Sequence, residues 1–268
     1  MIDYSNIVSA KLNIEYDRDL FISEYDQYIL PASKTILNNV FLIDQTAKFN
    51  DWWGMVDANV YQQADVRNND GVMIKQGFPS WLGTSLVYLN VKDDELRENS
   101  KNGSVSVRNL VLDSMGDFTF FPQYENLAIT KFIKQLPLTS IIGVRCVSLN
   151  NSFALIHRDN SNYMTASQKR LNFQPMTDNH LWKSGFVQIT INLTDANAPL
   201  YYCVTPTLSE QYRTINDPIY LFNDFFYHGV SMTSGDLRRQ IRVTGRPTPE
   251  LQQYIDSLTI ETIKELHE

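Results

Sequence analysis

Residues 186–193 read Phe-Val-Gln-Ile-Thr-Ile-Asn-Leu, and apolar and polar side chains alternate strictly along this stretch. Successive side chains of a β-strand point to opposite faces, so each set shares one face. The apolar set is Val187, Ile189, Ile191 and Leu193. The polar set is Gln188, Thr190 and Asn192. Because a strand with one polar face can line a ligand cavity, the stretch predicts such a strand here.

Short runs of β-branched and aromatic residues recur on both sides of this strand. Residues 140–156 predict two strands joined by a turn at Asn150-Asn151. Further strand candidates are 200–204, 219–222, 225–230 and 239–244. This spacing predicts an antiparallel sandwich or jelly roll. Helices are expected at 17–39, with a break near Pro31, and at 127–136.

A single domain is expected over residues 1–268, because no low-complexity segment or flexible linker divides the chain. Residues 1–125 are predicted to be an N-terminal elaboration of helix and short strands, and residues 126–247 the β core. Residues 248–268 predict a C-terminal helix, capped by Thr248 with Pro249 at its first position. Its apolar stripe is Leu251, Ile255, Leu258 and Leu266.

Composition limits the classes of partner. The chain has 268 residues, 43% hydrophobic and 20% charged, which predicts a packed core. A net charge of −7 and a pI near 5.1 argue against binding nucleic acid, which requires clustered Lys and Arg. Two cysteines form no disulfide framework, which favours a reduced compartment. With no signal pattern and no run of about 18 apolar residues, we expect a cytoplasmic protein without membrane contact.

Three of the potential metal ligands lie in strand contexts. His157 and Asp159 follow an apolar run and are two residues apart, so both can project from one strand face toward one ion. His228 ends another apolar run and can supply the third ligand. Two imidazoles and one carboxylate on one face of an octahedral ion are typical of non-haem Fe(II) oxygenases. The remaining positions bind cosubstrate and oxygen.

The segment after His228 strengthens this interpretation. Residues 231–236 predict a turn, and residues 237–244 return as an arginine-bearing strand. The chain therefore resembles the Fe(II)/2-oxoglutarate oxygenases, whose signature is His-x-Asp, a distant His and an Arg on the next strand. It looks most similar to the aspartyl/asparaginyl β-hydroxylase and free-amino-acid hydroxylase group, over roughly residues 127–247. The resemblance implies a double-stranded β-helix (jelly roll) core with flanking helices and Fe(II) held by His157, Asp159 and His228.

The resemblance also implies a guanidinium group that holds the distal carboxylate of 2-oxoglutarate. Arg238, Arg239 and Arg242 compete for this role, because the sheet register decides which of them points inward. Spacing favours Arg238 and then Arg242, which share a face, whereas Arg239 lies on the other. Arg145, on the strand before the metal ligands, and Asn192 are further cofactor-binding candidates. Gln188 stands roughly where relatives carry a second Arg.

The resemblance also implies an activity, the hydroxylation of an unactivated C–H bond by O2 with release of succinate and CO2. Asp159 favours hydroxylation over halogenation, because halogenating relatives replace that carboxylate with a small residue. The expected substrate is a small metabolite such as an amino acid, and the first alternative is a protein or peptide side chain. The second alternative is a non-enzymatic jelly-roll binding or structural protein. Residues 160–184 are either a solvated loop or a lid.

Overall fold

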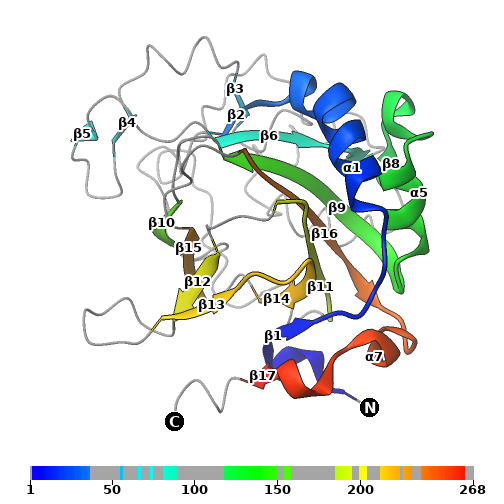
Figure 1. Ribbon diagram of the computed structural model, residues 1–268, viewed down its shortest axis with the longest axis vertical. Helices are drawn as coiled ribbons and strands as arrows, with labels where there is room; N and C mark the ends of the chain where they lie inside the picture. Colours follow the sequence, from blue (N-terminus) through cyan, green and yellow to red (C-terminus); the bar gives the residue numbers. More distant parts are fainter. Residues whose placement is uncertain are drawn as a thin grey trace, which may run out of the picture.

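A computed structural model gives the arrangement of the chain, and twelve ranges of it are described (Figure 1). These ranges are 2–36, 55–56, 66–67, 73–74, 81–89, 118–149, 154–157, 185–194, 199–203, 212–223, 226–230 and 237–262. They contain two stacked antiparallel sheets, with helices on the outer side of the larger sheet.

Eight strands of the chain pair in a nested order. They are β9 (Leu138–Leu149), β10 (Ala154–His157), β11 (Val187–Asn192), β12 (Leu200–Cys203), β13 (Arg213–Ile215), β14 (Ile219–Phe222), β15 (Tyr227–Val230) and β16 (Arg238–Pro247). The first pairs with the eighth, the second with the seventh, the third with the sixth and the fourth with the fifth, always antiparallel. The large sheet contains β14-β11-β16-β9 and the small sheet β10-β15-β12-β13. This order is that of a jelly roll, which confirms the predicted fold class.

Strands from both ends of the chain extend the large sheet. Beyond β14 lie β1 (Ile7–Lys11) and β17 (Glu261–Thr262), and beyond β9 lie β6 (Trp81–Ser85), β2 (Lys34–Ile36) and β3 (Met55–Val56). Two hairpin-like pairs stand apart, β4 (Val66–Arg67) with β5 (Met73–Ile74) and β7 (Val87–Leu89) with β8 (Phe118–Phe120). The single-domain organisation stays a prediction, which the shared sheet supports.

Two helical segments cover the outer face of the large sheet (Figure 1). The first comprises α1 (Arg18–Glu24), a π-helical turn (Tyr25–Ile29) and a 3-10 turn (Leu30–Ala32) that contains Pro31. The second is α5 (Ala128–Gln135). Glu24 ties them together, because its carboxylate accepts hydrogen bonds from the first two backbone N–H groups of α5, at 2.8 and 3.0 Å. A carboxylate there also stabilises the positive end of the helix dipole.

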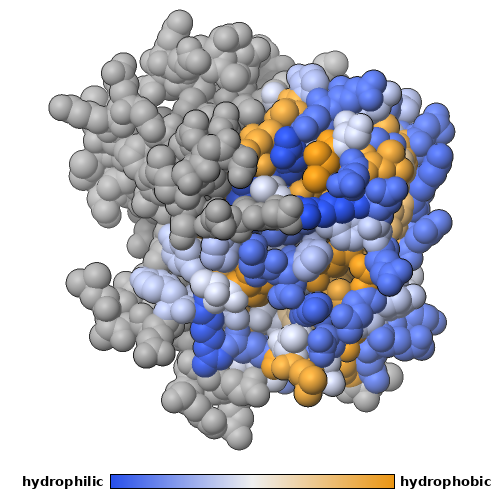
Figure 2. Space-filling model, in the orientation of Figure 1, coloured by the Kyte–Doolittle hydropathy of each residue, from blue (hydrophilic) through white to orange (hydrophobic). Residues whose placement is uncertain are grey.

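The apolar side chains form two cores. One lies between the helices and the outer face of the large sheet and includes Ile129, Ile133, Ile189 and Ile241. The other lies between the two sheets and includes Val147, Leu149, Leu200 and Val230. On the face shown in Figure 2, apolar side chains appear as separate patches among hydrophilic ones. Within the described ranges, no helix is long and apolar enough to cross a membrane.

The C-terminal helix is much shorter than the sequence predicts. It comprises one turn, α7 (Leu251–Tyr254), and is followed by a 3-10 turn and β17. Ile255 instead forms a β-bridge with Leu12, and the Asn13 N–H donates to the Tyr254 carbonyl at 2.7 Å. Because these bonds use backbone groups that a longer helix needs, the predicted helix is wrong for residues 255–262. Leu258 is accordingly 94% exposed, and Leu266 lies outside the described residues.

Candidate functional site

The polar face of β11 is buried between the two sheets. In register, Thr190 of β11 lies opposite Arg242 of β16, and Asn192 lies opposite Gln240. Arg242 in turn lies opposite Arg145 of β9. Directly opposed residues share a face, so these strands form one polar inner surface. Its buried polar members are Gln188, Thr190, Asn192, Arg238, Gln240 and Arg242.

The small sheet brings the two predicted histidines together. His157, the last residue of β10, is the Cα partner of His228 on β15. His228 is 1% exposed, and its ring packs against Phe222 of the large sheet with centroids 5.2 Å apart. Phe222 also packs against Tyr202 of β12, at 5.5 Å. The predicted ligands on β10 and β15 are therefore adjacent in the backbone, and His228 faces the inner surface.

The hydrogen bond of His228 leaves one ring nitrogen suited to a metal. Its Nδ1 lies 2.8 Å from the carbonyl oxygen of Phe226, and because that oxygen only accepts, Nδ1 carries the proton. The lone pair is then on Nε2. Histidines that bind metals commonly donate their other N–H to a carbonyl in this way. This part of the site fits an Fe(II) ligand.

Asp159, the predicted carboxylate ligand, lies outside the described residues. Within the described ranges no three His, Cys, Asp or Glu side chains gather as a metal site. The complete ligand set of His157, Asp159 and His228 therefore stays a prediction. The same holds for residues 160–184, the loop or lid of the sequence analysis, which also lie outside those ranges.

Arg238 is a buried cation at the start of β16. Burial lowers the pKa of its guanidinium to about 10; the nearby Tyr220 opposes this shift, and the positive charge of Arg242 adds to it. The guanidinium also hydrogen-bonds the hydroxyl of Tyr220, to which Gln240 Nε2 donates at 3.0 Å. Tyr220 thus contacts two of the inner-face side chains of β16, Arg238 and Gln240. An anion close to Arg238 would further stabilise its charged form.

Arg239 points to the other face of β16, as its place between Arg238 and Gln240 on the strand predicts. It donates through Nε and Nη2 to the two carboxylate oxygens of Asp26, both at 2.7 Å. This bidentate ion pair ties the π-helical turn after α1 to the large sheet. Of the three competing arginines, only Arg238 and Arg242 lie on the inner face.

Asn192 makes local hydrogen bonds with both ends of its amide. Its Nδ2 donates to Asn216 Oδ1, and its Oδ1 accepts from the Thr194 backbone N–H, both at 3.4 Å. These contacts hold the end of β11 against the turn before β14. Its cofactor-binding role stays a prediction.

Sequence reasoning did not identify Tyr220, Phe222 and Gln240 as part of this surface. Tyr220 and Phe222 lie in a run of apolar residues, Ile219 to Phe222, that is buried on both faces. Such a run has no alternation to show which side chains turn inward. The sequence does contain a signal for Gln240. It lies two residues from both Arg238 and Arg242, so on a strand it shares their face.

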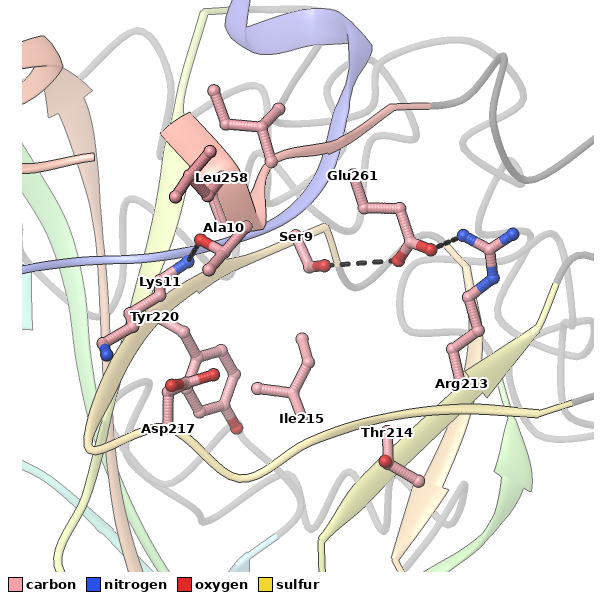
Figure 3. A pocket seen from close by; sticks show the side chains of 12 residues that line it. Ser9, Ala10, Lys11, Arg213, Thr214, Ile215, Asp217, Tyr220, Leu258 and Glu261 are labelled. Atoms are coloured by element: carbon pink, nitrogen blue, oxygen red, sulfur yellow. Dashed lines mark hydrogen bonds and ion pairs between the residues drawn. The ribbon is translucent and has the colours of Figure 1, made fainter. Parts of the chain in front are cut away.

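A hollow opens at the edge of the jelly roll, with a volume of about 330 Å³ (Figure 3). It lies between β1, β13 and the C-terminal segment, and Tyr220 forms part of its wall. Ser9 and Arg213 both point to the carboxylate of Glu261 in β17 (Figure 3). Tyr202 donates its hydroxyl hydrogen to the same carboxylate. These contacts fasten β17 over this edge.

No protein-family model matches the chain, and no curated protein matches its sequence. Among solved structures it is similar to AviO1 from Streptomyces viridochromogenes, with 14% identity over 92% of this chain and 95% of that one and a TM-score of 0.37. It is also similar to a prolyl-4-hydroxylase from Pseudomonas putida, with 10% identity over 64% of this chain and 74% of that one and a TM-score of 0.30. A third is an oxidoreductase of the 2OG-Fe(II) oxygenase family from Burkholderia pseudomallei. It shares 10% identity over 62% of this chain and 68% of that one, with a TM-score of 0.30.

Proposed function

We propose that this protein is an Fe(II)- and 2-oxoglutarate-dependent oxygenase that hydroxylates an unactivated C–H bond, with release of succinate and CO2. The observation that carries the proposal is the direct pairing of His157 with His228 on the small sheet, opposite a buried surface rich in arginine. Asp159, two residues beyond His157, completes the ligand set by sequence. When bound, the iron and 2-oxoglutarate supply the oxidation of the C–H bond by O2.

The protein's own residues orient the ligands of this reaction. The Phe226 carbonyl fixes the ring of His228 and keeps the Nε2 lone pair available. We assign the distal carboxylate of 2-oxoglutarate to Arg238, which is buried on the inner face, since a guanidinium offers a planar pair of donors to a carboxylate. The Tyr220 hydroxyl is a positioning group, because it contacts Arg238 and Gln240 together.

The position of Arg238 along the jelly roll agrees with this role. Arg238 lies opposite Leu149, next to the β9–β10 and β15–β16 connections. His228 lies two residues farther from that end of the fold than Val230, the partner of Ala154. Arg238 and His228 thus come from facing sheets, on the two strands that the β15–β16 connection joins. The core between the sheets includes Leu149, the partner of Arg238, and Phe222, which packs against His228.

We further propose a small metabolite such as an amino acid as the substrate, and the β-hydroxylase and free-amino-acid hydroxylase group as the nearest relatives. The burial of the inner polar surface between the sheets supports an enclosed site, which favours a small molecule over a peptide side chain. The cytoplasmic location and the lack of nucleic-acid and membrane partners stay predictions.

Anaerobic titration tests the function. Fe(II) added to the apoprotein, followed by 2-oxoglutarate, should produce a weak visible charge-transfer absorption that saturates at one cosubstrate per chain. Admitting oxygen should then yield succinate slowly even without a substrate. A protein that shows neither the absorption nor succinate formation is not an oxygenase of this class, and the non-enzymatic alternative would replace the proposal.

A further inference from the structure

Two arginines face each other across neighbouring strands on the inner surface. Arg242 of β16 and Arg145 of β9 are Cα partners, so both side chains leave the large sheet on the same side. Arg242 is 7% exposed and Arg145 is half-buried. Two guanidinium groups that leave a sheet on the same side can together donate charge-assisted hydrogen bonds to one oxyanion.

This pair occupies a different level of the fold from Arg238. Arg238 lies opposite Leu149 at the start of β16, whereas Arg242 and Arg145 are four residues farther along their strands. At a rise of about 3.3 Å per residue, the two levels are separated by roughly 13 Å of strand. Arg238 and the Arg145–Arg242 pair are therefore two separate cationic positions on one sheet.

The neighbours of the pair suit an anion. Thr190 of β11 lies opposite Arg242 on its other side and is 2% exposed, so a hydroxyl group flanks the guanidinium. Across from Arg145, β6 places Ser85 in register. The row across the sheet therefore reads Ser85, Arg145, Arg242 and Thr190. The Ser85 hydroxyl donates to the Val87 carbonyl at 2.7 Å, so the donors of this row that suit an anion are the two guanidinium groups and the Thr190 hydroxyl.

We propose that Arg145 and Arg242 bind an oxyanion of the substrate, a carboxylate or a phosphate group, while Arg238 holds the distal carboxylate of 2-oxoglutarate. This inference rests on the proposed function, because it names the substrate class of the same site. The resemblance implies cosubstrate ligands among these arginines, whereas the register divides them between two ligands.

Calorimetric titration of the full-length protein, loaded with Mn(II) in place of iron, tests the division. With 2-oxoglutarate saturating, inorganic phosphate and propionate are added in separate arms. We expect at least one of them to bind at one per chain, and the tighter of the two to identify the anion class. Arg145→Gln should weaken that binding by about tenfold or more, because a charge-assisted pair is lost. The affinity for 2-oxoglutarate should stay within about twofold of wild type.

Three further variants complete the design. Arg238→Gln should show the reverse pattern, with weakened 2-oxoglutarate binding and retained binding of the oxyanion probe when the probe is titrated alone. Arg145→Lys keeps the positive charge but loses the planar guanidinium group, so it should bind the probe with intermediate affinity. This variant replaces Arg145→Gln in the test if Arg145→Gln does not fold. Lys131→Gln, an exposed charge on α5, is the control for net charge and should change neither affinity.

The outcomes separate the two proposals. Normal 2-oxoglutarate binding with no probe binding, or with equal probe binding in Arg145→Gln and wild type, would overturn the oxyanion site and leave the oxygenase proposal standing. A loss of 2-oxoglutarate affinity in Arg145→Gln as large as in Arg238→Gln would overturn the division of the arginines. A wild-type protein that does not bind 2-oxoglutarate would overturn both.

Discussion

Arg239 and Asp26 form a bidentate ion pair on the outer face of the large sheet, with both N···O distances at 2.7 Å. The adjacent Arg238 is on the opposite face and buried between the sheets. Of these two neighbouring arginines, Arg239 therefore stabilises the contact between the helical segment and the large sheet, whereas Arg238 lies on the inner polar surface. The separation follows from the two-residue period of a strand.

These two arginines provide a matched pair of variants. Arg238→Gln should weaken 2-oxoglutarate binding to the metal-loaded protein by about tenfold or more, because the guanidinium contact to the distal carboxylate is lost. Arg239→Gln should leave that affinity unchanged but lower the free energy of unfolding by about 1 kcal/mol, since its ion pair is partly exposed to solvent. Calorimetry and urea unfolding measure the two effects. Equal cosubstrate affinities in both variants would remove Arg238 from its proposed role.

His228→Ala and His157→Ala should each abolish the retention of Fe(II), because two ligands cannot hold the ion as three do. Bound iron is measured after anaerobic loading and desalting. His180→Ala and His267→Ala, the remaining histidines of the chain, are the controls and should retain iron at the wild-type level. Wild-type iron content in either His157→Ala or His228→Ala would refute the ligand assignment.

Tyr25→Phe should destabilise the fold by about 1–2 kcal/mol, because it removes one partner of a buried hydrogen bond. The Tyr25 hydroxyl lies 2.8 Å from the Ser148 hydroxyl, and both residues are fully buried. Tyr28→Phe is the control, since Tyr28 is 45% exposed and its change should stay within about 0.5 kcal/mol. Urea unfolding measures both. Indistinguishable free energies of unfolding for the two variants would contradict the importance of the Tyr25–Ser148 contact.

The two cysteines should not react with a thiol reagent in the native protein. Cys146 and Cys203 are buried, and burial raises the pKa of the Cys146 thiol far above its ordinary value. Because a raised pKa keeps the thiol protonated, increasing the pH from 7 to 9 should not expose a reactive Cys146 thiolate. Ellman's reagent should detect no thiols in buffer and two in denaturant. Rapid reaction of a native thiol that accelerates with pH would show that at least one of the two cysteines is accessible.

The amino-acid sequence alone determined the class of fold and the faces of its central strand. Alternation over residues 186–193 is a local property of extended backbone, so it predicted the buried apolar and polar faces of β11. The same reasoning placed Arg238 and Arg239 on opposite faces. The sequence pattern did not predict β13, a strand of only three residues in which Arg213 and Thr214 are exposed. So short a strand has too little pattern to stand out.

Tertiary structure decided how these faces meet. Whether His157 stands beside His228, whether Arg145 stands beside Arg242, and which charge Arg239 pairs with depend on strand pairing between segments far apart in the chain. The end of α7 at Tyr254 depends on the bridge between Ile255 and Leu12. Local propensity carries no information about such partners, because the energy that selects them comes from hydrogen bonds and burial formed only when distant strands pack together.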